Sequence, residues 1–197
     1  VEAGLLGEAA PGGERFGPIW DQWNGRPPAQ QVADSVRANE EFVSRIEALS
    51  DAQRAEFTVA MFGSDVDLAG LVGMRFGEYA VHTWDIAVAL EPTAEVASDA
   101  VELLIDRLAA LAARAGKPAE VGRTVVIETV APSRRFALTT GPDVVLTPDS
   151  GTEPADLRLP AESFLRLVYG RLDPDHTPAE LADNAELASL RQLFTGF

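Results

Sequence analysis

The stretch Arg75-Phe-Gly-Glu78-Tyr-Ala-Val-His82-Thr-Trp-Asp85 brings together one of the chain's two histidines, two carboxylates and an arginine. If the stretch is helical, an advance of about 100° per residue places His82 roughly 40° and Asp85 roughly 20° from Glu78 around the helix axis. Arg75 lies about 60° from Glu78 on the same side. Because ionisable groups are costly to bury unless they are paired or bind a metal, this segment is the candidate functional site of the chain.

A metal site and an ion-paired network are both consistent with this spacing. Side chains four residues apart on a helix lie about 5–6 Å apart at Cβ, so Glu78 and His82 can share one metal. In the alternative, Arg75 neutralises Glu78 and Asp85 holds the His82 ring. Asp85 is too far along the helix to be a third ligand, and we expect it to orient His82. Zinc usually takes at least three protein ligands, so a further one has to come from another helix.

Composition narrows the class of protein. The chain has 197 residues, enough for one domain or two small ones, and a formal net charge of −15. That charge argues against nucleic acid as a partner, because binding to phosphates needs a basic surface. The chain has no cysteine, so a thiolate metal site and a cysteine nucleophile are excluded, and any reactive thiol must arrive with a ligand. No run reaches the ~20 apolar residues of a membrane span, and we expect a cytoplasmic protein with no membrane partner.

The order of helix and strand signals predicts an α+β fold. Residues 1–28 are rich in Gly and Pro and are expected to form a loop, which Trp20 and Trp23 attach to the body. Helices are expected at 29–49, at 64–90 and at 93–115. A further short helix is expected to begin at Ser50, where the sequence has the form of a capping box. Strands are expected at 124–130, 135–139, 144–147 and 155–159, and further helices at 160–170 and 185–194.

These elements divide into two predicted domains. Residues 1–116 are expected to form an antiparallel helical bundle, in which Gly70, Gly73 and Gly77 allow helices to approach closely. Residues 117–197 are expected to form a small α+β domain with a mostly antiparallel sheet.

His176 and Arg171 are the remaining candidate residues. His176 lies between turn-forming residues in the segment 173–178, which predicts an exposed loop. Arg171 follows Gly170 at the end of an apolar segment, where it either meets an anionic ligand or binds the last helix carbonyls. The sequence contains no P-loop, dinucleotide-binding or nucleophile-elbow motif.

The segment Gly77-Glu-Tyr-Ala-Val-His82-Thr-Trp-Asp-Ile86, followed by Ala87-Val-Ala-Leu90, resembles the mycothiol-dependent maleylpyruvate isomerase family of actinobacteria. The second half is similar to the same family at 155–159, 167–172 and 190–194. The resemblance covers roughly residues 28–197, and E-x-x-x-H-T-W-D is its most specific part. It implies a DinB-like four-helix bundle joined to an α+β domain likened to sterol carrier proteins.

The resemblance also implies roles for the candidate residues. A divalent metal, typically zinc, is implied to bind Glu78, His82 and a further histidine on an early helix. No histidine precedes His82 in the sequence. Either the first helix of the bundle lies upstream of Val1, as the absence of an initiator methionine suggests, or this relative has lost the ligand. Arg171 matches a Gly-Arg position of the family and is assigned to neutralising a carboxylate of the substrate or cosubstrate.

The resulting hypothesis is a metal- and mycothiol-dependent enzyme, either an isomerase or a thiol transferase. Asp85 and Arg171 form its catalytic group, Arg75 contributes to cofactor binding, and Glu78 and His82 bind the metal. Its expected partners are a small-molecule substrate and a low-molecular-weight thiol, in a monomer or homodimer. The alternatives are a DinB-like scaffold without enzyme activity, and a hydrolase that uses metal-activated water and needs no thiol.

Overall fold

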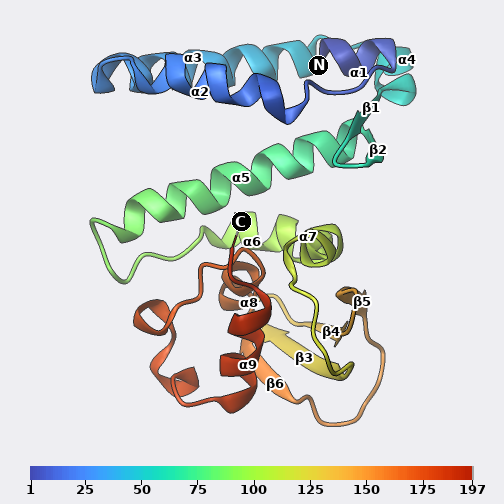
Figure 1. The fold of residues 1–197 in the computed structure, drawn as a ribbon, viewed down its shortest axis with the longest axis vertical. Helices are drawn as coiled ribbons and strands as arrows, with labels where there is room; N and C mark the ends of the chain where they lie inside the picture. The colour runs from blue at the N-terminus through green and yellow to red at the C-terminus, as the bar shows by residue number, and fades with distance from the viewer. Residues whose placement is uncertain (197) are drawn as a thin grey trace. The chain divides into compact units, whose positions relative to one another are not determined.

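The computed structural model describes residues 1–196 and has the predicted α+β fold. Figure 1 shows its elements in chain order. The helices are α1 (Glu2–Leu6), α2 (Phe16–Asn24), α3 (Pro28–Glu47), α4 (Asp51–Glu56), α5 (Leu68–Val88), α6 (Ser98–Leu104), α7 (Leu108–Ala115), α8 (Ala161–Val168) and α9 (Ala185–Leu193). The 3₁₀ turns are η1 (Gly13–Arg15), η2 (Ile105–Arg107), η3 (Pro174–His176) and η4 (Ala179–Leu181). The strands are β1 (Thr58–Met61), β2 (Ser64–Asp67), β3 (Thr124–Val130), β4 (Arg134–Thr139), β5 (Val145–Pro148) and β6 (Leu157–Pro160).

The chain forms two compact units, Val1–Met74 and Arg75–Phe197, and the division falls inside α5. Each unit is described by itself. The domain boundary predicted after residue 116 separates two family domains, whereas the compact units are defined by contacts within the fold. The units do not test that boundary, and it stays a prediction. Among residues 1–196, no helix combines the length and apolar character needed to cross a membrane.

The first unit has a small apolar core. Leu49, Phe57 and Val59 are its buried residues, and β1 pairs antiparallel with β2 beside them. The capping box predicted at Ser50 is confirmed: its hydroxyl accepts a hydrogen bond from the Gln53 backbone N–H at 3.3 Å, and the Gln53 side chain accepts one from Ser50 N–H at 3.0 Å.

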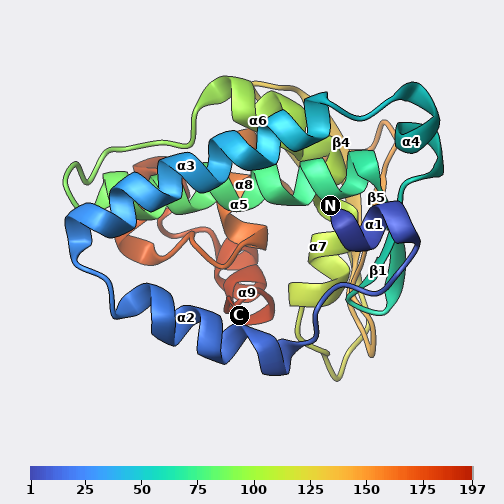
Figure 2. The same ribbon diagram turned by 90° about the horizontal axis from the view of Figure 1, so that it is seen from above.

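The loop predicted for residues 1–28 is wrong, because α1, η1 and α2 lie within it. Pro18 is compatible with α2, since it occupies the first turn, where backbone N–H groups have no partner within the helix. Trp20 does not attach this segment to the body as expected: it stacks on Phe16 at 5.8 Å and remains 62% exposed. Figure 2 shows α2 and α3 diverging from their connecting turn, and no residue of α2 is buried.

The start of α5 also differs from the sequence prediction. Residues 64–67, expected to begin this helix, form strand β2 instead. The helix begins at Leu68, and the Asp67 carboxylate accepts a hydrogen bond from Gly70 N–H at 2.7 Å. Asp67 thus supplies the capping oxygen, three residues after the expected start of the helix at residue 64.

The second unit is built around a four-stranded sheet of order β5-β4-β3-β6. The β5–β4 and β4–β3 pairs are antiparallel and the β3–β6 pair is parallel, so the sheet is mostly antiparallel, as predicted. Helix α8 contacts β3 and β6, and α7 contacts β5 and α8. The single helix expected at 93–115 is divided into α6, η2 and α7. Its apolar residues Val101, Leu104, Ile105, Leu108 and Leu111 are buried in the same core.

Candidate functional site

Helix α5 has a buried side and a polar side within the second unit. Gly77, Val81 and Trp84 are buried, and Val81 and Trp84 belong to the core. The side chains of Glu78 and His82 are 51% and 57% exposed, whereas Asp85 is 29% exposed. These three residues therefore form a polar edge beside the buried stripe, as the helical spacing predicts. We call Glu78, His82 and Asp85 the α5 acidic–histidine group.

His82 lies between the two carboxylates of this group. Its Nε2 is 3.2 Å from Glu78 Oε2, and its Nδ1 is 2.8 Å from Asp85 Oδ2. A carboxylate on Nδ1 fixes the orientation of the ring and leaves Nε2 directed at Glu78. The orienting role predicted for Asp85 thus has the geometry it requires.

Asp85 is also paired with Arg171, which comes from the second half of the chain. Arg171 Nε donates to Asp85 Oδ1 at 3.2 Å, and a terminal nitrogen donates to Oδ2 at 3.4 Å. Partial burial alone would raise the pKa of Asp85, but hydrogen bonds from Arg171 and His82 outweigh it and the pKa is lowered. Asp85 is therefore a carboxylate that accepts from both neighbours at neutral pH.

The turn after α8 places Arg171 at this position. Gly170 has a left-handed conformation with φ of 68°, and a Cβ there would lie 2.2 Å from the Gly196 backbone nitrogen. Arg171 also donates to the Tyr169 carbonyl at 3.0 Å. Of the two alternatives left open by the sequence, binding to a carbonyl is observed, and the carboxylate that Arg171 neutralises in the structure belongs to Asp85.

Arg75 points to a neighbour on its own helix. Its guanidinium donates to the Tyr79 hydroxyl at 3.0 Å and lies over the Tyr79 ring at 4.5 Å. This is a cation–π contact of the usual kind. The predicted cofactor-binding role of Arg75 stays a prediction.

The segment around His176 is a 3₁₀ turn whose residues 173–175 are exposed, as predicted, but the His176 ring itself is partly buried. The ring is 27% exposed, its Nδ1 lies 2.8 Å from Asp173 Oδ1, and it meets the Trp84 ring edge-on at 5.6 Å. A further neighbour of Trp84 is Arg166, a buried arginine that lies over the indole at 4.8 Å and binds the Glu162 carboxylate through two nitrogens. The sequence contained a signal for this network, a lone Arg inside the apolar run 164–168, but gave no sign of its partners.

The α5 acidic–histidine group has part of what a divalent metal requires. Two ligand atoms on a tetrahedral metal with bonds of about 2.0–2.2 Å lie roughly 3.3–3.6 Å apart, slightly more than the observed 3.2 Å between Glu78 Oε2 and His82 Nε2. Asp85 supplies the hydrogen bond that a metal-bound histidine usually makes through its other nitrogen. Within residues 1–196, no set of three His, Cys, Asp or Glu side chains is placed to bind one metal. Glu78 and His82 therefore fit two ligand positions of a metal, and Asp85 fits the carboxylate that orients the histidine.

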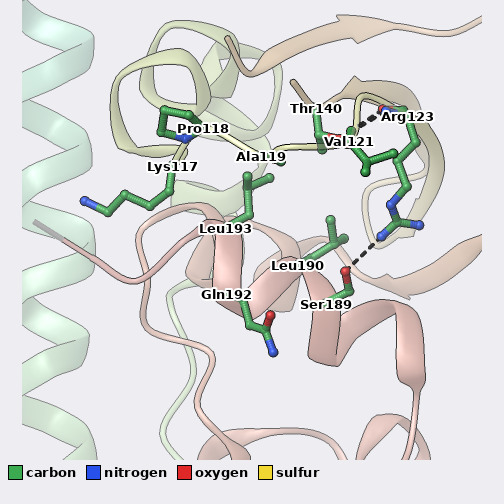
Figure 3. Close-up of a pocket in the computed structure, with 10 residues that line it drawn as sticks. All are labelled: Lys117, Pro118, Ala119, Val121, Arg123, Thr140, Ser189, Leu190, Gln192 and Leu193. Atoms are coloured by element: carbon green, nitrogen blue, oxygen red, sulfur yellow. Dashed lines mark hydrogen bonds between the residues drawn. The ribbon is translucent and has the colours of Figure 1, made fainter. Parts of the chain in front are cut away.

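A cavity of about 370 Å³ lies elsewhere in the second unit. Figure 3 shows it between the segment after α7 and helix α9, where Arg123 points at Ser189 and Lys117 points away from both. The lining residues are Lys117, Pro118, Ala119, Val121, Arg123, Thr140, Ser189, Leu190, Gln192 and Leu193. Since these do not include Arg171 or any member of the α5 acidic–histidine group, the cavity gives that group no pocket.

Comparison with known proteins supports the resemblance seen in the sequence. Residues 4–87 match the family described as mycothiol maleylpyruvate isomerase N-terminal domain. The matched range contains all three members of the α5 acidic–histidine group and confirms the predicted family for this part of the chain. No curated protein and no solved structure matches the chain.

Proposed function

We propose, on the premise that residues 4–87 are a mycothiol maleylpyruvate isomerase N-terminal domain, that this chain is a mycothiol-dependent isomerase or thiol transferase. The family match supports an involvement of mycothiol. The reaction type and the need for a divalent metal, with zinc as the expected ion, are our proposal.

One observation carries the proposal: the helix of the matched family presents His82 Nε2 3.2 Å from a carboxylate, while a second carboxylate holds Nδ1 at 2.8 Å. Glu78 and His82 would hold the metal through these atoms. When bound, a divalent metal lowers the pKa of a coordinated thiol and so makes it a nucleophile at neutral pH.

The chain's own residues then have distinct tasks. Asp85 keeps the His82 ring in one orientation, and Arg171 fixes Asp85 through two hydrogen bonds. Arg171 is thus a positioning residue that acts through Asp85. In the reaction proposed, the thiolate sulfur forms a bond to an electrophilic alkene carbon of the substrate, while the C=C π bond breaks and its electron pair moves onto the conjugated carbonyl. In an isomerase, the C–S bond breaks again after rotation about the former double bond, which restores the double bond and the thiolate. In a transferase, the C–S bond is kept and the adjacent carbon takes a proton from solvent.

Turnover of maleylpyruvate with and without mycothiol tests this proposal. The chain should convert the substrate only when mycothiol is present, and the variant Glu78→Gln should lose that activity while remaining folded by circular dichroism. Conversion without any thiol would indicate a hydrolase, and absence of conversion or of thiol consumption with a panel of electrophiles would favour a scaffold. Either result would overturn the proposal. The cytoplasmic location and the monomeric or homodimeric state expected from the sequence stay predictions.

A further inference from the structure

A cavity of about 790 Å³ lies within the first unit, between the segment that joins α1 to α2 and the β1–β2 hairpin. Backbone hydrogen bonds hold its two walls together: Ala10 N–H donates to the Ala60 carbonyl at 2.8 Å, and Ala60 N–H donates to the Glu8 carbonyl at 3.4 Å. Ala10 and Met61 also pack against the small apolar core of this unit. The fold itself therefore forms this cavity, and its size is typical of small-molecule binding sites.

Phe62 lines this cavity at a position that suits neither its backbone nor its ring. Because Met61 pairs with Ser64, Phe62 and Gly63 form the two-residue turn of the hairpin, and their φ values are 53° and 79°. The first position of such a turn favours Asn, Asp or Gly, since other side chains are strained at positive φ. The ring of Phe62 is also 67% exposed, so burial in the core does not offset this strain. Strain of this kind at an exposed aromatic residue points to a function for the ring.

The charge around this cavity is negative. Among the described residues that line it, Asp65 alone is ionisable, and its side chain is exposed on the hairpin. The Glu14 carboxylate lies against Gly12 on the other wall. The two segments that form the walls, 8–16 and 58–65, together carry three carboxylates and one arginine, in a chain whose net charge is −15. Both this charge and the face of an aromatic ring attract cations.

We infer that this cavity binds a small amphipathic cation, in which an ammonium group is attached to an apolar body. Phe62 and Asp65, three residues apart in the hairpin, receive the ammonium group, the first through its ring and the second through its carboxylate. Phe16 and Met61 pack against the apolar body. The ring of Phe16 is held in place by Trp20, which stacks on it at 5.8 Å.

Three probes that share a benzyl group test this inference: benzyltrimethylammonium, benzyl alcohol and phenylacetate. Amide chemical shifts of the whole chain, measured as each probe is added, give both the affinity and the place of binding. We expect the shift changes to centre on residues 9–16 and 60–65. Benzyltrimethylammonium should bind roughly three- to tenfold more tightly than benzyl alcohol, because only the cation gains from the ring and the carboxylate. Phenylacetate should bind most weakly, since the carboxylates repel it.

The variant Phe62→Asn separates binding from folding, because it removes the ring and introduces a residue that favours positive φ. It should bind benzyltrimethylammonium about fivefold more weakly or worse, while its thermal stability stays equal to that of the wild type or rises. Asp65→Asn should bind the cation and the alcohol about equally. Val32→Asn is the matched control, since Val32 is also 67% exposed but lies on α3 and does not line the cavity. It should bind each probe as the wild type does.

The inference is overturned if benzyl alcohol binds the wild type as tightly as the cation does, or if Phe62→Asn keeps the wild-type affinity. It is also overturned if Phe62→Asn loses thermal stability together with binding, since the ring would then be structural. Self-association of the wild type that Phe62→Asn abolishes, measured by analytical ultracentrifugation, would show that a second copy covers the cavity and would overturn it as well. Each of these outcomes leaves the proposed function untouched, because no member of the α5 acidic–histidine group lines this cavity.

Discussion

The chain has two histidines, and each is held by an aspartate three residues away, with Nδ1 2.8 Å from a carboxylate oxygen. The surroundings of the two rings are nevertheless opposite. His82 is 57% exposed and its Nε2 faces Glu78, whereas His176 is 27% exposed and its ring packs against Trp84. An aspartate–histidine pair alone therefore does not identify a functional site.

The remaining surroundings of each ring distinguish the two pairs, and for His82 they include its second nitrogen, Nε2. At His82 it is paired with another carboxylate on an accessible helix edge, which suits a shared metal ion. At His176 the residues around the ring form a buried structural network of Trp84, Arg166 and Glu162. These surroundings agree with the metal-binding role proposed for His82 and with a structural role for His176. Each of the following predictions tests one of these two roles.

The largest expected effect lies in the network beside His176. Arg166→Leu removes the counter-charge of Glu162, whose side chain is 12% exposed, and should lower the free energy of unfolding by about 3–5 kcal/mol. Urea denaturation, followed by tryptophan fluorescence, measures this change in the free energy of unfolding. Arg158→Leu is the matched control, because its pair with Glu128 is exposed and should contribute less than about 1 kcal/mol. Equal losses in the two variants would show that the network is not structural.

The next effect concerns the two aspartates. Asp85→Asn keeps the shape of the side chain but removes the carboxylate that orients His82, and should weaken zinc binding by roughly 10- to 100-fold. Competition with a chelating dye measures the affinity. Asp173→Asn makes the same change at His176 and should leave zinc affinity unaltered, so a similar loss in both variants would contradict the assignment.

Removal of the two histidines should have unequal effects on stability. His176→Ala loses the contact with Trp84 and the hydrogen bond to Asp173, and should lower the free energy of unfolding by about 1–2 kcal/mol. His82→Ala changes an exposed side chain and should stay within about 0.5 kcal/mol of the wild type. Thermal unfolding of the two metal-free variants compares their stabilities. A larger loss of stability in His82→Ala than in His176→Ala would refute the structural role of His176.

The smallest effect is a dependence on pH. The folded-state pKa of Asp85 is below its ordinary value of 3.8, so its pair with Arg171 contributes stability above that value, which is lost as pH falls through the folded pKa. The difference in unfolding free energy between wild type and Asp85→Asn should be less than about 1 kcal/mol and constant near neutrality. It should shrink below pH ~4. A difference that grows in acid would contradict the pairing.

The features that were predicted correctly depend on residues that are close together in the sequence. The capping box at Ser50 and strand β3, with the expected bounds 124–130, follow from local patterns. The group on α5 also follows from helical spacing. Contacts made across the chain could not be predicted in this way: Arg171 and Asp85 are 86 residues apart, and the His176 ring packs against Trp84, which comes from a distant helix. Residues 64–67 show the reverse case, where pairing with β1 prevailed over a local helix-start signal.

Zinc binding by the two histidine variants tests the central claim most directly. Titration calorimetry of the purified protein should give one zinc ion per chain for the wild type and for His176→Ala. His82→Ala and Glu78→Gln should show no binding at one equivalent. A wild-type chain that binds no stoichiometric zinc, or a His82→Ala variant that binds it as tightly as the wild type, would contradict the assignment of Glu78 and His82 as metal ligands.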